Sequence, residues 1–378
     1  VVVQVALSCT LLVGAGLFLR SLREARSVDP GFDTGPAGIL WPNLSLSGIP
    51  DAEGEALWPE IERRMLADAT IDRVGLADVL PLGAAIQTTG IRIPGHASDR
   101  PDGRTEVDHN NVSAGYFQVM DIAIVRGRGF EPSDAVEGSG SVIVSRAFQE
   151  RFFPEGAVGR SLDGGALTVV GVAEDTKVRT LGEAPRPQIY FPLGSRGYIE
   201  AVHVVVRGPG TGPELLAAAR RVLDGVRPGI VVFAAKTMQQ HLGLMLFAPR
   251  MAALLLTALG ALALLLASVG LYGVVSYAVA RRTREMGIRL SLGASPSDVL
   301  TLVVTGGMRM VLVGAVVGVA LAVLAGGAIS SFLIGVSGTD ATTMIAISAI
   351  LLLVGLLASW IPARRAVRMD PSQVLRSE

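Results

Sequence analysis

Four long stretches of the chain are apolar and contain no Asp, Glu, Lys or Arg. They are Val1–Leu19, Met251–Ala280, Met310–Thr339 and Ala341–Ala363. A transmembrane helix needs about 20 predominantly apolar residues, and buried helices of soluble proteins rarely stay uncharged over such a length. The pattern therefore predicts four membrane-spanning helices.

The composition agrees with this prediction. Hydrophobic residues make up 50% of the chain, the mean hydropathy is +0.50, and only 17% of residues are charged, whereas soluble domains carry roughly 25%. The formal net charge of zero argues against a nucleic-acid partner. The single cysteine, Cys9, lies in the first apolar stretch, so no intrachain disulfide can stabilise an exported domain.

The first apolar stretch differs from a secretory signal peptide. It has no initiator Met, no basic n-region, and no small-residue cleavage site before Arg20. We interpret it as a span whose cytoplasmic lead-in is missing, and we expect the chain to be a piece of a longer product, truncated at its N-terminus.

Basic residues predict the orientation of the spans. Arg exceeds Asp and Glu in the loop Arg281–Asp298 and in the tail after Ala363, whereas the turn Ser330–Asp340 has no basic residue. An excess of Arg and Lys in short loops marks the cytoplasm, so we expect the turn and the region at about 27–245 to lie outside. Three arginines directly after the first span run against this rule: Arg20, Arg23 and Arg26.

Between Val28 and His241 the pattern changes to short strands, turns and a few amphipathic helices. Strands are predicted at Gly38–Leu46, Ser141–Ser145, Leu167–Ala173, Ala201–Val206 and Ile230–Phe233. Helices are predicted at Asp51–Leu66, Arg146–Phe153 and Pro213–Val226. This irregular order is typical of an α+β domain. The predicted fold class is a membrane protein with four transmembrane α-helices and a large extracytoplasmic α+β domain.

The sequence shows no catalytic or metal-binding pattern. The histidines have neither a His-Glu-x-x-His spacing nor a cysteine partner for zinc. We interpret His109 and the adjacent Asp108 as a surface pair. A P-loop is missing because neither lysine, Lys177 or Lys236, follows a glycine. We expect no enzyme activity and no cofactor, with ATP bound by a partner subunit.

The loop after the second span carries the most informative local pattern. Arg281, Glu285 and Arg289 lie at successive i, i+4 positions and can pair along one helix face. We therefore expect the second span to continue as one helix through Leu292.

The residues after this helix predict a tight turn and a second helix. Gly293 can end the first helix, and Ser295 can cap the next, with Pro296 at its first position and Asp298 completing a capping box. Physics alone leaves two interpretations open, namely a coupling element and a cytoplasmic turn with a solvated basic face.

Family resemblance favours the coupling element. Arg284-Glu285-Met286-Gly287-Ile288-Arg289, followed by Leu292-Gly293-Ala294, resembles a pattern of FtsX/MacB/LolE-type ABC transporter permeases, although Met286 replaces their usual isoleucine. The tail from Pro362 to Pro371 is similar to the ending of that family. Val13–Leu22 and Ser268–Gly273 resemble the acidobacterial duplicated orphan permease subgroup.

The outer region resembles the MacB-type periplasmic core domain. The similar segments are Ser113–Phe117, Arg126–Phe130, Val169–Val172 and Ile189–Leu193. The resemblance implies a first span with its stalk at 1–26, a MacB-like core domain at 27–245 and an FtsX-like domain with three spans at 246–378.

The resemblance also implies a mechanism in the bacterial inner membrane. A MacB/LolD-like ATPase would dock beneath the spans, and the permease would pair with a second half or form a homodimer, with a periplasmic adaptor as a further partner. Force would enter through the ATPase-coupling residues Arg281, Arg284, Glu285, Met286, Gly287, Ile288, Arg289, Leu292, Gly293 and Ala294. Gly314 and Gly318 form a small-x-x-x-small motif for helix packing.

Three functions fit this architecture. The first is a permease subunit that drives efflux of drugs or peptides, or lipoprotein handling. The second is an FtsX-like regulator of cell-wall hydrolases, and the third is an ATPase-independent membrane sensor. Exported material bound to the outer domain separates the first two functions. Loss of function on mutating the coupling residues argues against the third.

Overall fold

The computed structural model describes residues 1–83, 85–96, 98, 100–282, 285, 295–330 and 333–367. The chain forms two compact units. We call Val1–Ser27 with Leu246–Glu378 the helical unit, and Val28–Met245 the sheet unit.

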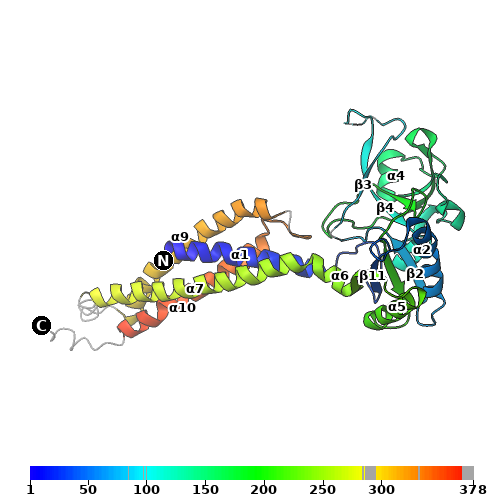
Figure 1. The fold of residues 1–378 in the computed structure, drawn as a ribbon. Coiled ribbons are helices and arrows are strands. Elements are labelled where there is room, and N and C mark those ends of the chain that lie inside the picture. Colours follow the sequence, from blue (N-terminus) through cyan, green and yellow to red (C-terminus); the bar gives the residue numbers. More distant parts are fainter. Residues whose placement is uncertain are drawn as a thin grey trace. The chain divides into compact units, whose positions relative to one another are not determined.

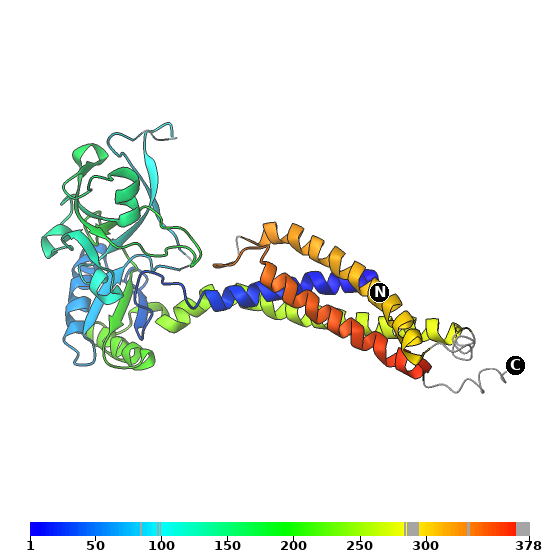
Figure 2. The same cartoon turned by 180° about the vertical axis from the view of Figure 1, so that it is seen from behind.

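The helical unit contains four long helices (Figure 1). They are α1 (Val2–Glu24), α7 (Phe247–Arg281), α9 (Pro296–Ile329) and α10 (Ala341–Val367). Helix α1 packs against the other three and lies between α7 and α9 in both ribbon views (Figures 1 and 2). All four helices are long and apolar enough to cross a membrane, which confirms the four predicted spans.

Two of these helices are longer than a bilayer requires. Helix α7 has 35 residues and α9 has 34, which at about 1.5 Å per residue is roughly 50 Å each. The hydrocarbon core is about 30 Å thick. Each helix can therefore cross the bilayer and still continue beyond it.

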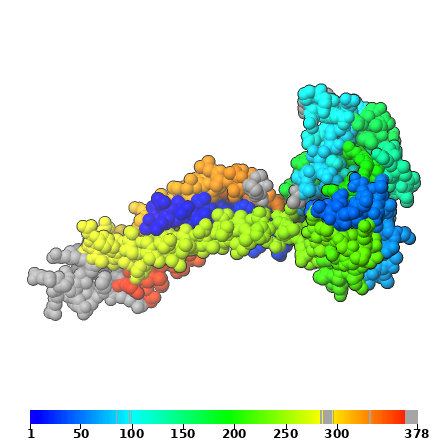
Figure 3. Space-filling view, viewed as in Figure 1, coloured from blue at the N-terminus to red at the C-terminus, as the bar shows by residue number. Residues whose placement is uncertain are grey.

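The helices present apolar side chains outward. On α7, Leu254 and Leu255 are 62% and 63% exposed, and Figure 3 shows this helix as a continuous band along one face of the helical unit. The contact side of α1 is different, because Cys9, Val13 and Leu17 are almost fully buried. An outward apolar face is what lipid requires of a membrane helix.

An ion pair near the end of α1 accounts for one of the outer arginines. Arg20 Nη1 lies 2.6 Å from Asp340 Oδ2, and Asp340 also accepts a hydrogen bond from the backbone N–H of Thr343 in the first turn of α10. Arg20 therefore has an acidic partner in the connection between α9 and α10.

The sheet unit is built on one mixed sheet. Its strand order is β11-β1-β10-β2-β4-β9-β6-β8-β5, with β3 beside β4 and β7 beside β8. The β4–β9 and β6–β8 pairs are parallel and the other pairs are antiparallel. The strands are β1 (Gly38–Asn43), β2 (Arg73–Ala77), β3 (Thr88–Ile91), β4 (Thr105–Val112), β5 (Ile124–Gly127), β6 (Ser141–Ser145), β7 (Ser161–Leu162), β8 (Leu167–Ala173), β9 (Gln188–Pro192), β10 (His203–Arg207) and β11 (Val231–Thr237).

The helices of this unit divide the sheet into two lobes. Helices α2 and α5 share a core with β1, β2 and β10 that includes Trp58 and Leu215, and α4 packs on β6, β8 and β9 through Phe148. Between the lobes, β2 and β4 are paired only at Ala77 and Val112. The helical segments are α2 (Asp51–Leu66), α3 (Tyr116–Met120), η1 (Pro132–Ala135), α4 (Arg146–Phe152), η2 (Asp163–Gly165), α5 (Gly212–Val226) and α6 (Met238–Met245).

The predicted fold class is confirmed, and several predicted elements coincide with the observed ones. The bounds of α2, β6 and β8 are those that the sequence predicts. The strand predicted to reach Leu46 ends at Asn43, because the Asn43 side chain accepts a hydrogen bond of 2.7 Å from Leu46 N and begins a turn.

The interpretation of Asp108 and His109 as a surface pair is wrong. Asp108 is 3% exposed and accepts from Arg179 Nη2 at 2.5 Å and from Arg186 Nε at 2.8 Å. A buried carboxylate needs such partners. His109 is half-buried with its ring against Phe191, and burial is the main cause that lowers its pKa.

Candidate coupling site

The C-terminal end of α7 begins the candidate site. The helix ends at Arg281, and the backbone N–H of Arg282 donates to the carbonyl groups of Ala278 and Val279 at 3.2 and 3.1 Å. The prediction of one helix continuing through Leu292 is wrong. Basic residues in a last turn interact favourably with the negative end of the helix dipole, and this favours an end at Arg281.

Much of the predicted coupling stretch lies outside the described residues. Glu285 is helical. The predicted residues that lie outside the described ones are Arg284, Met286, Gly287, Ile288, Arg289, Leu292, Gly293 and Ala294. The described structure therefore brackets the stretch, with Arg281 and Arg282 before it and the start of α9 after it.

The start of α9 is fixed by the predicted capping box. Ser295 Oγ accepts from Asp298 N at 3.3 Å, and Ser295 N donates to Asp298 Oδ2 at 3.0 Å. Pro296 occupies the first helical position, where its missing N–H costs nothing. This part of the prediction is confirmed, and it gives the second helix a defined first turn.

A groove of about 370 Å³ lies between the last turns of α7 and the first turns of α9. Its wall is mostly apolar, and its charged residues are Arg281 and Arg282, both exposed. Tyr277 also lines the groove and is 66% exposed. An apolar groove flanked by guanidinium groups can receive a protein segment with an apolar side chain and nearby acidic groups.

The same end of the bundle is tied to α10. Arg365 Nη1 donates a hydrogen bond of 2.9 Å to Tyr272 Oη on α7. A Cβ atom on Gly307 of α9 would lie 3.0 Å from Ser359 Cβ on α10 and 3.3 Å from Val275 on α7. Three helices therefore meet closely at this end of the bundle.

The two glycines of the small-x-x-x-small motif lie where α9 meets α1. A Cβ atom on Gly314 would be 2.7 Å from Val5 Cβ, and one on Gly318 would collide with Cys9 and the carbonyl oxygen of Ala6. Thr10 Oγ1 donates to the carbonyl of Gly318 at 3.1 Å. Both glycines thus serve a contact within one chain.

Sequence reasoning missed Tyr277 and the Tyr272–Arg365 hydrogen bond. A signal was present, because both tyrosines lie in the last turns of an otherwise apolar helix and Arg365 lies in the last turn of α10. Among the described residues no group of His, Cys, Asp and Glu is arranged to hold a metal ion.

Comparisons with known proteins establish what kind of chain this is. Residues 10–222 match the MacB-like periplasmic core domain, and residues 257–371 match the FtsX-like permease C-terminal family. The chain belongs to the FtsX/MacB-type permeases. As in that family, it is a multi-pass protein of the inner membrane, and its sheet unit corresponds to the extracytoplasmic domain.

Similar proteins of this permease family are export proteins by name. The chain is 28% identical over 282 residues to a probable export ATP-binding/permease protein of Pseudomonas fluorescens, covering 70% of this chain and 42% of that protein. It is 28% identical over 328 residues to a macrolide export ATP-binding/permease protein MacB of Rhodospirillum rubrum, covering 82% and 48%. The permease thus spans less than half the length of these relatives.

Solved structures also include a similar domain. The periplasmic region of MacB from Actinobacillus actinomycetemcomitans is 12% identical, with a TM-score of 0.38, and the match covers 58% of this chain and 95% of that chain.

Proposed function

We propose that this permease transmits force from a cytoplasmic ATPase to its extracytoplasmic domain, and that this motion drives efflux or work on the cell envelope. The observation that carries the proposal is the arrangement at the coupling site. The groove residues Arg281, Arg282 and Tyr277 and the capped start of α9 flank the stretch that resembles a coupling element.

The proposed path of the force follows the contacts of the helical unit. A push on the end of α7 reaches α10 through Arg365 and Tyr272, and α9 through Gly307. Helix α9 then bears on α1 at Gly314 and Gly318. Because helices in such close contact cannot easily slide past one another, the four helices would move together.

In this proposal a partner protein hydrolyses the ATP. The similar proteins from Pseudomonas and Rhodospirillum are named ATP-binding/permease proteins, and this chain matches less than half of each. We propose that a MacB/LolD-like ATP-binding unit docks at the coupling site. A second permease half or a second copy, and a periplasmic adaptor, would complete the assembly.

The test is reversal of the two arginine charges at the groove. The chain is co-expressed with each MacB/LolD-like ATPase of its own genome, and the complex is captured and assayed for ATP hydrolysis in lipid nanodiscs. One ATPase should co-purify. The double variant Arg281→Glu, Arg282→Glu should lower the amount of recovered ATPase at least tenfold. Its two new carboxylates would repel the acidic groups with which the proposed ATPase faces the groove.

Arg250→Glu is the matched control, since Arg250 is exposed on the first turn of the same helix. It should leave co-purification within twofold of the unaltered chain. If no ATPase is recovered with the unaltered chain, or if the double variant recovers as much as the control, the coupling proposal is wrong. The ATPase-independent sensor then becomes the better interpretation.

A further inference from the structure

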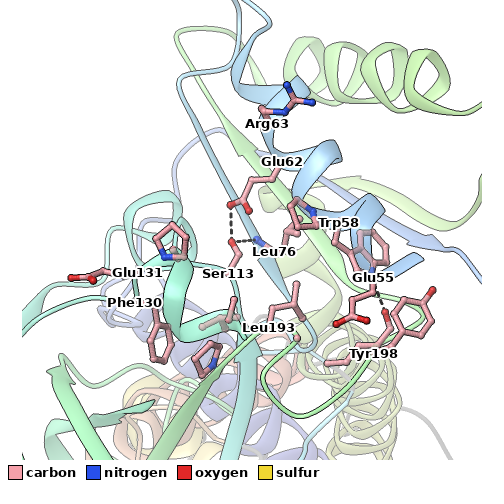
Figure 4. A pocket seen from close by; sticks show the side chains of 18 of the residues that line it. Glu55, Trp58, Glu62, Arg63, Leu76, Ser113, Phe130, Glu131, Leu193 and Tyr198 are labelled. Atoms are coloured by element: carbon pink, nitrogen blue, oxygen red, sulfur yellow. Dashed lines mark hydrogen bonds between the residues drawn. The ribbon is translucent and has the colours of Figure 1, made fainter. Parts of the chain in front are cut away.

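The sheet unit contains a cavity of about 500 Å³ that the coupling proposal does not use (Figure 4). It lies between α2, the segment that joins β4 to α3, the η1 region and the segment that joins β9 to β10. Its volume is within the range of sites that hold drug-sized molecules, roughly 300 to 1,000 Å³.

The walls of the cavity are mostly apolar and well anchored. They include Trp58, Phe130 and Leu193. Trp58 is only 3% exposed, and its Nε1 donates a hydrogen bond of 2.9 Å to the carbonyl of Ile199. This hydrogen bond fixes the indole, so the aromatic wall is formed before any ligand arrives.

One carboxylate in the cavity has an incomplete set of partners. Ser113 Oγ accepts from the backbone N–H of Leu76 at 3.0 Å and donates to Glu62 Oε1 at 2.7 Å. In the described part of the chain, Glu62 has no basic partner. Burial raises its pKa, and the Ser113 hydrogen bond opposes this effect.

The nearest arginine on the same helix does not neutralise Glu62. Arg63 forms an ion pair with Glu60, and in Figure 4 its guanidinium group points away from Ser113 and Glu62. The charged residues that line the cavity are Glu55, Glu62, Glu131 and Arg63. Glu131 pairs with Arg128 at 3.8 Å, so the negative charge of the lining comes mainly from Glu55 and Glu62.

We propose that this cavity binds an apolar small molecule that carries one protonated amine. The amine would pair with Glu62, and the apolar part would lie against Trp58, Phe130 and Leu193. Glu62 is half-buried, and a charge-assisted hydrogen bond compensates its partial loss of hydration far better than a neutral contact does. An anion would instead meet the carboxylates of Glu55 and Glu62, and a neutral apolar molecule would shield Glu62 from water without replacing the lost hydration.

This inference does not depend on ATPase docking, because every residue it uses lies in the sheet unit. Binding can therefore succeed or fail independently of the coupling proposal. An exporter and a sensor would both use such a site, but for different purposes.

The experiment compares three molecules of nearly equal shape. The full chain in lipid nanodiscs is titrated by calorimetry with 1-naphthylmethylamine, with neutral 1-naphthalenemethanol and with 1-naphthoic acid, and empty nanodiscs provide the blank. The amine should bind at least tenfold more tightly than the alcohol, and the acid should bind more weakly than both.

Three variants locate the site. Glu62→Gln keeps an acceptor for Ser113 and should weaken amine binding at least tenfold, whereas Glu53→Gln, on the same helix but outside the cavity, should change it less than twofold. Ala114→Trp, at an exposed small residue of the lining, should fill the cavity and abolish binding of the amine.

Several outcomes overturn the proposal. They are absence of amine binding, equal binding of amine and alcohol, full binding by Glu62→Gln, and full binding by Ala114→Trp. If Glu62→Gln fails to fold, the ratio of amine to alcohol affinity and the Ala114→Trp variant still decide the question.

Discussion

The two units of this permease use the same apolar residues in opposite ways. In the sheet unit, Leu40 and Leu44 are 0% exposed within a core shared by strands and helices. In the helical unit, Leu254 and Leu255 of α7 are more than half exposed. Burial from water stabilises the first pair by roughly 25 cal/mol per Å², whereas lipid is as apolar as the helices and supplies no such force between them.

The helical unit therefore depends on close approach and on polar contacts to the backbone. Helix α1 supplies many of these contacts. Ser8 Oγ donates to the carbonyl of Gly260 at 3.2 Å, Thr10 Oγ1 donates to the carbonyl of Gly318 at 3.1 Å, and Ser21 Oγ accepts from Ile334 N at 2.7 Å. Specificity in this unit comes from small residues and hydroxyl groups, and in the sheet unit it comes from burial.

The largest change in stability is expected from a leucine substitution in the sheet unit, and the same substitution in the helical unit gives the comparison. Leu40→Ala should destabilise the sheet unit by about 2–5 kcal/mol, because it leaves a cavity in a packed core. Leu255→Ala should change the stability of the helical unit by less than about 0.5 kcal/mol, because lipid fills the space. Thermal unfolding in nanodiscs measures both. A large loss for Leu255→Ala would mean that protein rather than lipid covers this face of α7.

The next effect tests close approach within the helical unit. Gly318→Ala places a methyl group against Cys9 and the Ala6 carbonyl and should destabilise the unit by about 1–3 kcal/mol. Gly327→Ala is the matched control on the same helix, since a Cβ atom there meets nothing within 4 Å. It should be neutral or stabilising by up to about 1 kcal/mol, because alanine favours the helix. Equal effects of the two substitutions would show that α9 does not depend on α1 at this point.

A smaller effect tests burial of a titratable group in the sheet unit. His203 is 9% exposed, its ring stacks on Trp41 with centroids 4.8 Å apart, and Nδ1 lies 3.1 Å from the carbonyl oxygen of Asp78. Burial lowers the pKa of His203 from 6.5 to about 4. The neutral ring therefore contributes stability above pH 6.5, and this stability is lost as the pH falls toward 4 because the unfolded chain takes up the proton first.

The variant His203→Gln removes this proton uptake. Between pH 7 and pH 5 the unaltered chain should lose on the order of 1–2 kcal/mol more stability than the variant. Chemical denaturation at the two pH values measures the difference between the slopes, whatever the absolute stability of the variant. Parallel slopes would show that His203 takes up its proton equally in the folded and the unfolded chain.

The sequence predicts the parts of the fold that have strong local signals. Uncharged stretches reveal the four spans, and the Ser295–Asp298 pattern predicts the cap of α9, which the structure contains. Helix α2 is predicted with Asp51 at its start, and α5 follows from its apolar spacing. These features depend on residues that are close together along the chain.

The sequence does not predict features that form between distant residues. The burial of Asp108 depends on Arg179 and Arg186, which lie far along the chain, and no local pattern links them. The groove needs Tyr277 of α7 to face α9, and the cavity needs Glu62 to meet Ser113. The sequence also does not reveal that α7 ends at Arg281. The i, i+4 charge pairs contribute only about 0.3–0.5 kcal/mol each and do not fix the end of a helix.

The smallest expected effect concerns the ion pair between Arg20 and Asp340, which lie 2.6 Å apart. Arg20 is exposed, so Arg20→Gln should destabilise the helical unit by less than about 1 kcal/mol. Arg23→Gln on the same helix should have no measurable effect, because in the described structure Arg23 forms no ion pair. The difference between the two variants should shrink in 1 M salt, where the screening length falls to about 3 Å. If instead Arg23→Gln is the more destabilising variant, or if salt leaves the difference unchanged, the charge of Arg20 is not what holds α1 to the connection between α9 and α10. Arg20 would then need another account than pairing with Asp340.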